Sequence, residues 1–224
     1  MLRGAIAYLR LNIKSLLKDK ISFVWSIVFP LVMFGLNHDS ISQDQLIYWW
    51  EYMIVCSFVY GIGIYAVELR DNGCLRTLFS INSSRKIFLL GNLLTQILFC
   101  IITIGVFNLI VTITKGYDYF SMILLALLLV LLNIPIALGG LFLSLPRRIS
   151  IESIKTIFTI FITLMFFCSQ SEHYGKYTIL SMFYNLIYLT NPHIILVYLI
   201  LSIMLTIIGV YSLSRLSAVS EVRR

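Results

Sequence analysis

Ile87 to Thr114 reads IFLLGNLLTQILFCIITIGVFNLIVTIT, and none of its 28 residues is charged. A helix needs about 20 predominantly apolar residues to cross roughly 30 Å of hydrocarbon, so this run is long enough for a complete span. A helix also satisfies its backbone hydrogen bonds internally, as the bilayer interior requires. The whole chain is 59% hydrophobic and only 12% charged, which is unlike a soluble domain. We therefore expect an all-α integral membrane protein.

Five other runs with few or no charges flank this segment. Ser121 to Leu145 and Ile194 to Ser214 are both long enough to span. Ile47 to Val67 is also long enough, although it carries Glu51 near one end. The other two runs are shorter, and apolar runs near 15 residues can also form re-entrant or buried helices. The sequence predicts one domain, residues 1–224, with six transmembrane helices at about 21–37, 47–67, 87–114, 121–145, 154–170 and 194–214.

The distribution of basic residues predicts the orientation. With six spans both termini lie on one side of the membrane, and that side receives 15 of the 17 Lys and Arg residues. Only Lys115 and Lys176 fall on the other side. Because cytoplasmic loops are enriched in Lys and Arg, we expect both termini in the cytoplasm and the protein in the plasma membrane. This topology explains the net charge of +7 without nucleic-acid binding, and the Ile-, Leu- and Asn-rich composition suggests a bacterial source.

Residues 1–20 predict an amphipathic helix at the membrane surface. Apolar side chains recur at helical spacing, and the basic residues lie mostly away from that face. Such a helix rests in the headgroup plane, with its lysines toward anionic lipid or an acidic partner. A lipid-surface anchor and a partner contact both fit this pattern.

The segment YWWEY, Tyr48 to Tyr52, predicts the outer boundary of the second span, because Tyr and Trp rings prefer the membrane interface. Glu51 lies among these rings. A carboxylate at the edge of a span either reaches the headgroups in a structural role or faces a polar path as a gate. The sequence leaves both interpretations open.

A second outer segment precedes the last span. ILSMFYNLIYL, Ile179 to Leu189, is too short to span and too apolar for a plain loop, so we expect a short re-entrant helix in the outer leaflet. The pair Asn191-Pro192 would stop it, because the residue before a proline avoids the α region. Pro30 and Pro135 lie inside predicted spans and predict kinks.

Motifs for bond chemistry are absent from the sequence. It contains no G-x-x-x-x-G-K-[ST] phosphate loop, no G-x-S-x-G turn and no H-E-x-x-H pair. Its three histidines lack ligand partners at fixed spacing, so no metal site is expected. We expect no polar cluster inside the spans that could relay protons or support catalysis. The chain is thus expected not to be an enzyme, and energy for active transport would come from another subunit.

The charged segment LRDNGCLRTLFSINSSRKIFLLGN, Leu69 to Asn92, lies between two predicted spans. It turns at Gly73 and then places Leu75, Leu78 and Phe79 on one helical face. A short amphipathic helix in a cytoplasmic loop is a surface that a soluble partner can push against. A generic loop helix would show the same periodicity.

This segment resembles the first cytoplasmic loop of permease subunits of the type-2 ABC exporter class (ABC-2). The chain departs from the family pattern at Leu69, Cys74 and Asn82. The family's outer Asn-Pro motif before the last span is matched by Asn191-Pro192. The resemblance extends over essentially the whole chain, and the matching loop positions are Arg70, Asp71, Gly73, Leu75, Leu78, Ser84, Arg85 and Gly91.

The resemblance implies a mechanism and a set of site residues. In the family, the Gly-containing helix is a coupling helix that docks on a separate ATPase subunit, which binds ATP and Mg. Two permease subunits, identical or homologous, pair with two ATPase subunits, and the cargo path runs between the permeases. The implied ATPase-coupling residues are Arg70, Asp71, Gly73, Leu75, Arg76 and Leu78. The implied pathway residues are Phe29, Met33, Tyr60, Phe161, Met165 and Phe166, and Glu51 joins them as the gate candidate from its place in the second span.

The resemblance also frames the expected function. We expect ATP-driven export of a hydrophobic or amphipathic cargo, such as an antimicrobial or other amphipathic peptide, in export or immunity. A lipid, drug or glycan cargo is an alternative within the same class. A polytopic membrane protein without transport activity, a sensor or scaffold, is the alternative from another class.

Overall fold

The computed structural model describes residues 6, 8–10, 12–13, 20–37, 41–81, 84–146, 149–169, 178–189 and 192–216. Within these ranges every regular element is helical. The elements are α2 (Lys20–Leu36), η2 (Gln43–Gln45), α3 (Leu46–Phe58), η3 (Val59–Ile64), α4 (Tyr65–Asp71), α5 (Cys74–Ile81), α6 (Arg85–Lys115), α7 (Tyr119–Leu132), α8 (Ile134–Gly139), η4 (Gly140–Ser144), α9 (Ile151–Ser169), α10 (Ile179–Ile187) and α11 (Pro192–Arg215).

Four of the described helices are long and apolar enough to cross a membrane. They are Gln43–Asp71, which joins η2, α3, η3 and α4, together with α6, α9 and α11. A fifth is formed if α7 and the segment Ile134–Ser144, which meet at an angle of 41°, count as one span; we call this helix pair the bent span. The all-α membrane class predicted from sequence is confirmed at this level. α2, in the place of the first predicted span, is helical over only 17 residues.

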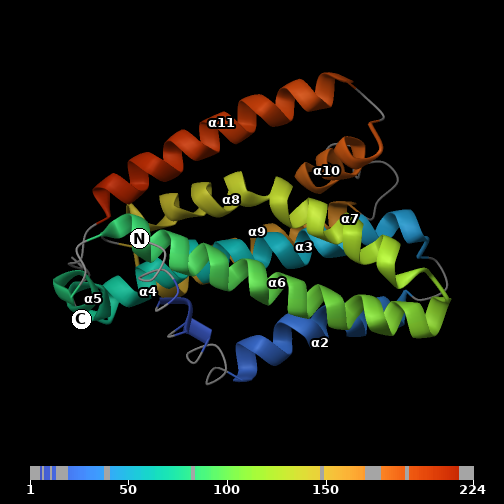
Figure 1. Cartoon of the computed structure of the whole chain (residues 1–224), viewed down its shortest axis with the longest axis horizontal. Helices are drawn as coiled ribbons and strands as arrows, with labels where there is room; N and C mark the ends of the chain where they lie inside the picture. Colours follow the sequence, from blue (N-terminus) through green and yellow to red (C-terminus); the bar gives the residue numbers. More distant parts are fainter. Residues whose placement is uncertain are drawn as a thin grey trace.

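The helices form an elongated bundle (Figure 1). The helix Gln43–Asp71 lies at its centre, where α3 packs against α2, α6, α7, α8, α9 and α10. α2 and α11 lie along opposite long edges, while α5 and α10 lie near opposite ends. These ends are called the α5 end and the α10 end below.

The predicted kink at Pro135 is observed as a break between α7 and α8. Proline lacks an N–H and clashes with the preceding turn, so the regular hydrogen-bond ladder cannot continue through it. Asn133 lies at the break and caps both helices. The carbonyl of Leu132 accepts a hydrogen bond from the Tyr198 hydroxyl of α11, 2.8 Å away. A side chain from α11 thus satisfies a main-chain carbonyl next to the break.

Glycines allow the bent span to pack closely on its neighbours. A Cβ on Gly63 would lie 2.2 Å from the carbonyl oxygen of Gly140, and one on Gly209 would lie 2.6 Å from that of Leu138. Gly63 belongs to η3, a π-helical stretch inside the helix Gln43–Asp71. Small residues let helix backbones approach in membranes, and here they bring α11 and η3 against the two sides of the bent segment.

The outer surface of the bundle is apolar along most of its length. Exposed Ile, Leu, Val and Phe side chains run along α6, α7, α9 and α11. Only 6% of the most apolar part of α11 is buried inside the chain. A surface of this kind is what a multi-pass membrane protein presents to lipid or to a neighbouring subunit.

Candidate functional site

The predicted coupling segment forms a sharp turn followed by a short helix at the α5 end. α4 ends at Asp71, and Gly73 follows with a φ of 73°. That left-handed conformation is costly for residues with a Cβ and readily adopted by glycine, which explains why glycine stands at this position. The Gly73 N–H donates to the carbonyl of Arg70, and α5 begins at Cys74.

The predicted coupling segment, residues 70–79, is exposed over only part of its length. Gly73, Cys74, Arg76 and Thr77 are exposed, whereas Leu75 is 0% exposed. Asp71, Leu78 and Phe79 are half-buried. The amphipathic helix predicted from Leu75, Leu78 and Phe79 is therefore present, with Leu75 as its anchor in the core. The accessible part of this segment is formed by the residues around Gly73 and Arg76.

Arg70, just before the turn, is buried and anchors this segment to the bundle. The side chain is 1% exposed, and its Nη1 donates hydrogen bonds to the main-chain carbonyls of Ser144 and Pro146, at 2.9 Å and 3.0 Å. Its Nε donates to the Asp71 carboxylate, 3.0 Å away. The two carbonyls lie at and just beyond the end of η4, where helix carbonyls lack partners within the helix. Arg70 thus fastens the turn before α5 to the end of the bent span, a role that the sequence pattern did not indicate.

The described N-terminal residues also reach the α5 end. Tyr8 packs edge-on against Phe88 of α6, and Phe88 packs edge-on against Phe79 of α5. Asn12 is buried and donates to the side chain of Asn92 on α6. The described residues among 6–13 are helical. They contact α6 through an aromatic and a polar pair, and the rest of the predicted surface helix lies outside the described residues.

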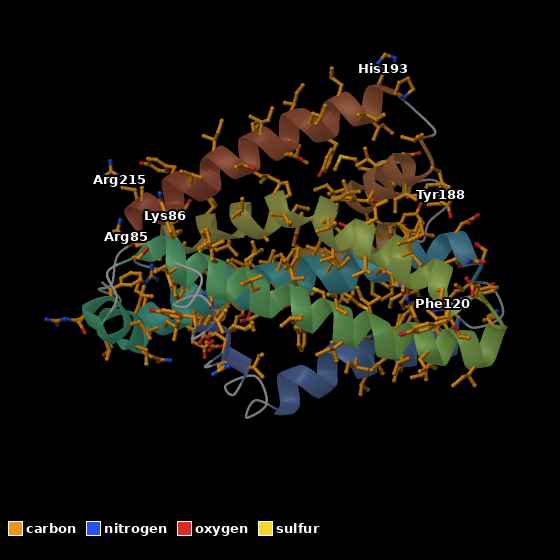
Figure 2. All side chains as sticks on the ribbon, viewed as in Figure 1. Arg85, Lys86, Phe120, Tyr188, His193 and Arg215 are labelled. Carbon is orange, nitrogen blue, oxygen red and sulfur yellow. The ribbon has the colours of Figure 1, made fainter. Side chains whose placement is uncertain are left out.

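Exposed cations gather at the α5 end. Arg85, Lys86 and Arg215 lie there, while Phe120, Tyr188 and His193 lie at the opposite end (Figure 2). Arg85 donates from Nη1 to the carbonyl of Ser214, close to the end of α11. Cations at a helix C-terminus interact favourably with its dipole. The α5 end is accordingly the basic end of the bundle.

Glu51 is completely enclosed within the chain. It is 0% exposed, so its carboxyl does not extend to the surface of the bundle, and its role as a gate stays a prediction. Its Oε2 accepts a hydrogen bond of 2.8 Å from Nδ2 of Asn133, at the break between α7 and α8. Glu51 is buried because its side of α3 packs against α7 and α8, and the helix begins at Gln43, about two turns before it.

The prediction of an outer aromatic belt is wrong for both tryptophans. Trp49 and Trp50 are each 1% exposed. The Trp50 indole donates to Oδ1 of Asn108 on α6, 2.7 Å away. Together with the Glu51–Asn133 pair, this contact places buried, hydrogen-bonded polar groups between the central helix and its neighbours. The spacing of polar residues along one apolar helix does not indicate which polar residue of another helix each of them will contact.

The predicted pathway residues are only partly brought together. Phe29 packs against Tyr52, and Phe166 packs against both Tyr52 and Trp49, with ring centroids 4.8 to 5.6 Å apart. Tyr60 lies farther along, where its hydroxyl is hydrogen-bonded to Thr159 of α9. The remaining three differ in exposure: Phe161 is exposed on α9, whereas Met33 and Met165 are half-buried.

The predicted helix before the last span is observed as α10. The Thr178 hydroxyl caps it by accepting from the Ser181 N–H, and Pro192 opens α11. Asn191 of the predicted outer motif lies outside the described residues. Tyr188, just after α10, donates to the Asp44 carboxylate of η2, 2.7 Å away. Burial and the nearby Asp44 carboxylate raise the pKa of Tyr188, so the hydroxyl keeps its proton as a donor.

No family model, curated protein or solved structure matches this chain. One feature could transmit movement from the surface to a membrane helix. It is the connection from the exposed turn at Gly73, through buried Arg70, to the end of the bent span.

Proposed function

We propose that this chain is the membrane-spanning permease subunit of an ATP-driven exporter of the ABC-2 type. The observation that carries the proposal is the pair of hydrogen bonds from Arg70 Nη1 to the main-chain carbonyls of Ser144 and Pro146. It joins an exposed helix at the basic end of the bundle to a bent apolar span. A subunit driven from outside the membrane needs such a rigid connection between a docking surface and a transmembrane element.

The proposed docking surface is the exposed part of the coupling segment. Gly73, Cys74, Arg76 and Thr77 would contact a soluble ATPase subunit that binds ATP and Mg. Arg70, Asp71, Leu75 and Leu78 would hold the segment against the bundle. Nucleotide-driven movement of the ATPase would then displace α5 together with α4 and the end of η4.

The proposed topology has six spans, with α2 as the first and with α7, α8 and η4 as one bent span. Both termini and α5 would face the cytoplasm, because the exposed cations gather at that end. α10 would be a re-entrant helix at the outer face of a plasma membrane. The bacterial source remains an expectation from composition.

The cargo path would run between two permease subunits, identical or homologous. The exposed side of α9, including Phe161, would border it, and the rings of Phe29, Tyr52 and buried Phe166 would support that side from within the bundle. An apolar and aromatic border suits a hydrophobic or amphipathic cargo, such as an amphipathic peptide, better than a long hydrophilic glycan.

Affinity purification of the tagged chain from its native host tests this function. We expect a soluble ATPase in equal stoichiometry, identified by mass spectrometry of the intact complex. Arg76→Glu should abolish the association, because Arg76 is exposed beside Gly73, whereas Lys115→Glu, at the other end of α6, should leave it intact. Recovery of the folded wild-type chain without any ATPase would instead favour a sensor or scaffold.

A further inference from the structure

Glu51 is a fully buried acidic side chain in the middle of the bundle. Its Oε2 accepts from Asn133 Nδ2, and its Oε1 has no hydrogen-bond partner among the described residues. Oδ1 of Asn133 is likewise buried and without a partner in that part of the chain. Two side chains joined by a hydrogen bond thus each keep one buried oxygen acceptor for which the described residues supply no donor.

Asn133 cannot supply that donor. Its Nδ2 carries two hydrogens, and both are used: one bonds Glu51, and the other bonds the carbonyl of Leu129 at 2.9 Å. The second bond belongs to the helix break, where Leu129 also accepts from the Asn133 N–H. The amide is thus held in place by the backbone and cannot turn to pair with Glu51 differently.

The helices around Glu51 bring no cation to it. From α6 comes the Cys100 thiol, which lies close enough to interact electrostatically with the carboxyl. From α9 and α10 come aromatic side chains, Phe166 beside Trp49 and Tyr184 stacked on Tyr48. The charged residues of α6 and α9 stand near the helix ends, and Lys155 of α9 pairs with Glu68. Neither α2 beyond Lys20, α7, α8 nor α10 contains a charged residue.

We propose that the Glu51–Asn133 pair is a proton-binding site that locks the break of the bent span. A carboxylate enclosed in apolar surroundings with a single neutral donor is strongly disfavoured. One proton on the carboxyl removes the charge and supplies the one donor that the two unpartnered oxygens lack. The neutral pair then bridges the central helix Gln43–Asp71 to the break at Asn133. This inference concerns the fold of the chain and does not depend on an ATPase partner or on cargo.

Infrared spectroscopy of the full chain in phosphatidylcholine vesicles tests the proposal directly. In the difference spectrum between wild type and Glu51→Gln at neutral pH, we expect loss of the C=O stretching band of a protonated carboxylic acid. Glutamate labelled with ¹³C at the carboxyl should shift that band and so assign it to a glutamate. Loss of a carboxylate band instead would overturn the proposal.

Thermal unfolding of detergent-solubilised variants gives a second readout. Glu51→Gln is neutral and keeps both an acceptor and a donor, so its melting temperature should stay near that of wild type. Glu51→Leu should lower it clearly, because Asn133 Nδ2 then loses one of its two hydrogen-bond acceptors and keeps only the Leu129 carbonyl. If Gln were as damaging as Leu, or if sodium ions stabilised wild type but not Glu51→Gln, the site would hold a charged carboxylate and the proposal would fail. Should Glu51→Gln fail to fold, the labelled wild-type chain at neutral pH decides by whether a glutamic acid band is present.

Discussion

Arg70 donates a hydrogen bond from Nη1 to the main-chain carbonyl of Ser144, 2.9 Å away and 74 residues later in the chain. The same nitrogen reaches the carbonyl of Pro146. A guanidinium is well suited to this position, because it stays charged and offers several donors in a fixed fork. The bond links the turn before α5 to the end of the bent span.

Replacing Arg70 should therefore destabilise the fold. Arg70→Gln would leave the carbonyls of Ser144 and Pro146 without their charged donor, at a cost of about 3 kcal/mol in the free energy of unfolding. Denaturant unfolding of the solubilised protein, followed by circular dichroism, measures this. Arg76→Gln is the matched control: Arg76 is exposed, so its change should stay within about 0.5 kcal/mol. Equal effects of the two substitutions would mean that the Ser144 contact contributes little.

Tyr198→Phe tests the hydrogen bond between α11 and the break that separates α7 from α8. Without the hydroxyl, the Leu132 carbonyl loses its 2.8 Å hydrogen bond, and unfolding should become easier by about 1 kcal/mol. Tyr211→Phe serves for comparison, because Tyr211 is exposed on the same helix and its ring contact with Arg215 would persist. A stability loss in Tyr211→Phe alone would contradict the assigned role of Tyr198.

Gly63→Ala tests the close approach of η3 to the bent span. The added Cβ would lie 2.2 Å from the Gly140 carbonyl oxygen, so the backbones must separate, at a cost of about 1 to 3 kcal/mol. Gly35→Ala is the control, since a Cβ there meets nothing within 4 Å and alanine favours the helix. The melting temperature should fall for the first variant and stay level or rise for the second.

The Asp118 cap at the start of α7 should make the stability of the protein depend on pH. Its carboxylate accepts from the Ser121 N–H, 2.8 Å away, and this bond lowers the pKa of Asp118 below its usual value. A lowered pKa means that the capping contribution is present above the unfolded-state value of about 3.9 and is lost as the pH falls through the folded-state value. Asp118→Asn keeps an acceptor at this cap but does not titrate.

Unfolding curves of wild type and Asp118→Asn, recorded from neutral pH downward, check that prediction. The difference in stability between them should be constant near neutrality and should shift toward Asp118→Asn below about pH 4. A difference that does not change with pH would show that the carboxylate is not the capping group.

Much of the helical architecture could be predicted from the sequence, because it depends on local properties. The length of the uncharged run from Ile87 to Thr114 predicts α6, Pro135 predicts the break, and the spacing of Leu75, Leu78 and Phe79 predicts α5. The helix boundaries around Glu51 were less accurate, since Gln43 to Gln45 begin the helix earlier than the apolar run does.

The residues that connect the helices could not be predicted in the same way. Glu51 meets Asn133 across 82 residues, and Arg70 meets the carbonyls at the end of η4 across more than 70. Nothing local distinguishes Arg70 from exposed Arg76, or Trp50 from a residue of an interfacial belt. Their burial depends on which helix faces lie opposite one another, and that is a property of the three-dimensional packing.

The π-helical stretch Val59–Ile64 has a consequence for helical phase. Glu51 and Arg70 are 19 positions apart, and an α-helix advances about 100° per residue, so a regular helix would place them about 100° apart around its axis. A π turn accommodates one extra residue, which rotates the following part back by about the same angle. Both side chains can then reach the same bent span, one at its break and one at its end. In an unbroken α-helix, one of these two contacts would be turned away from its partner.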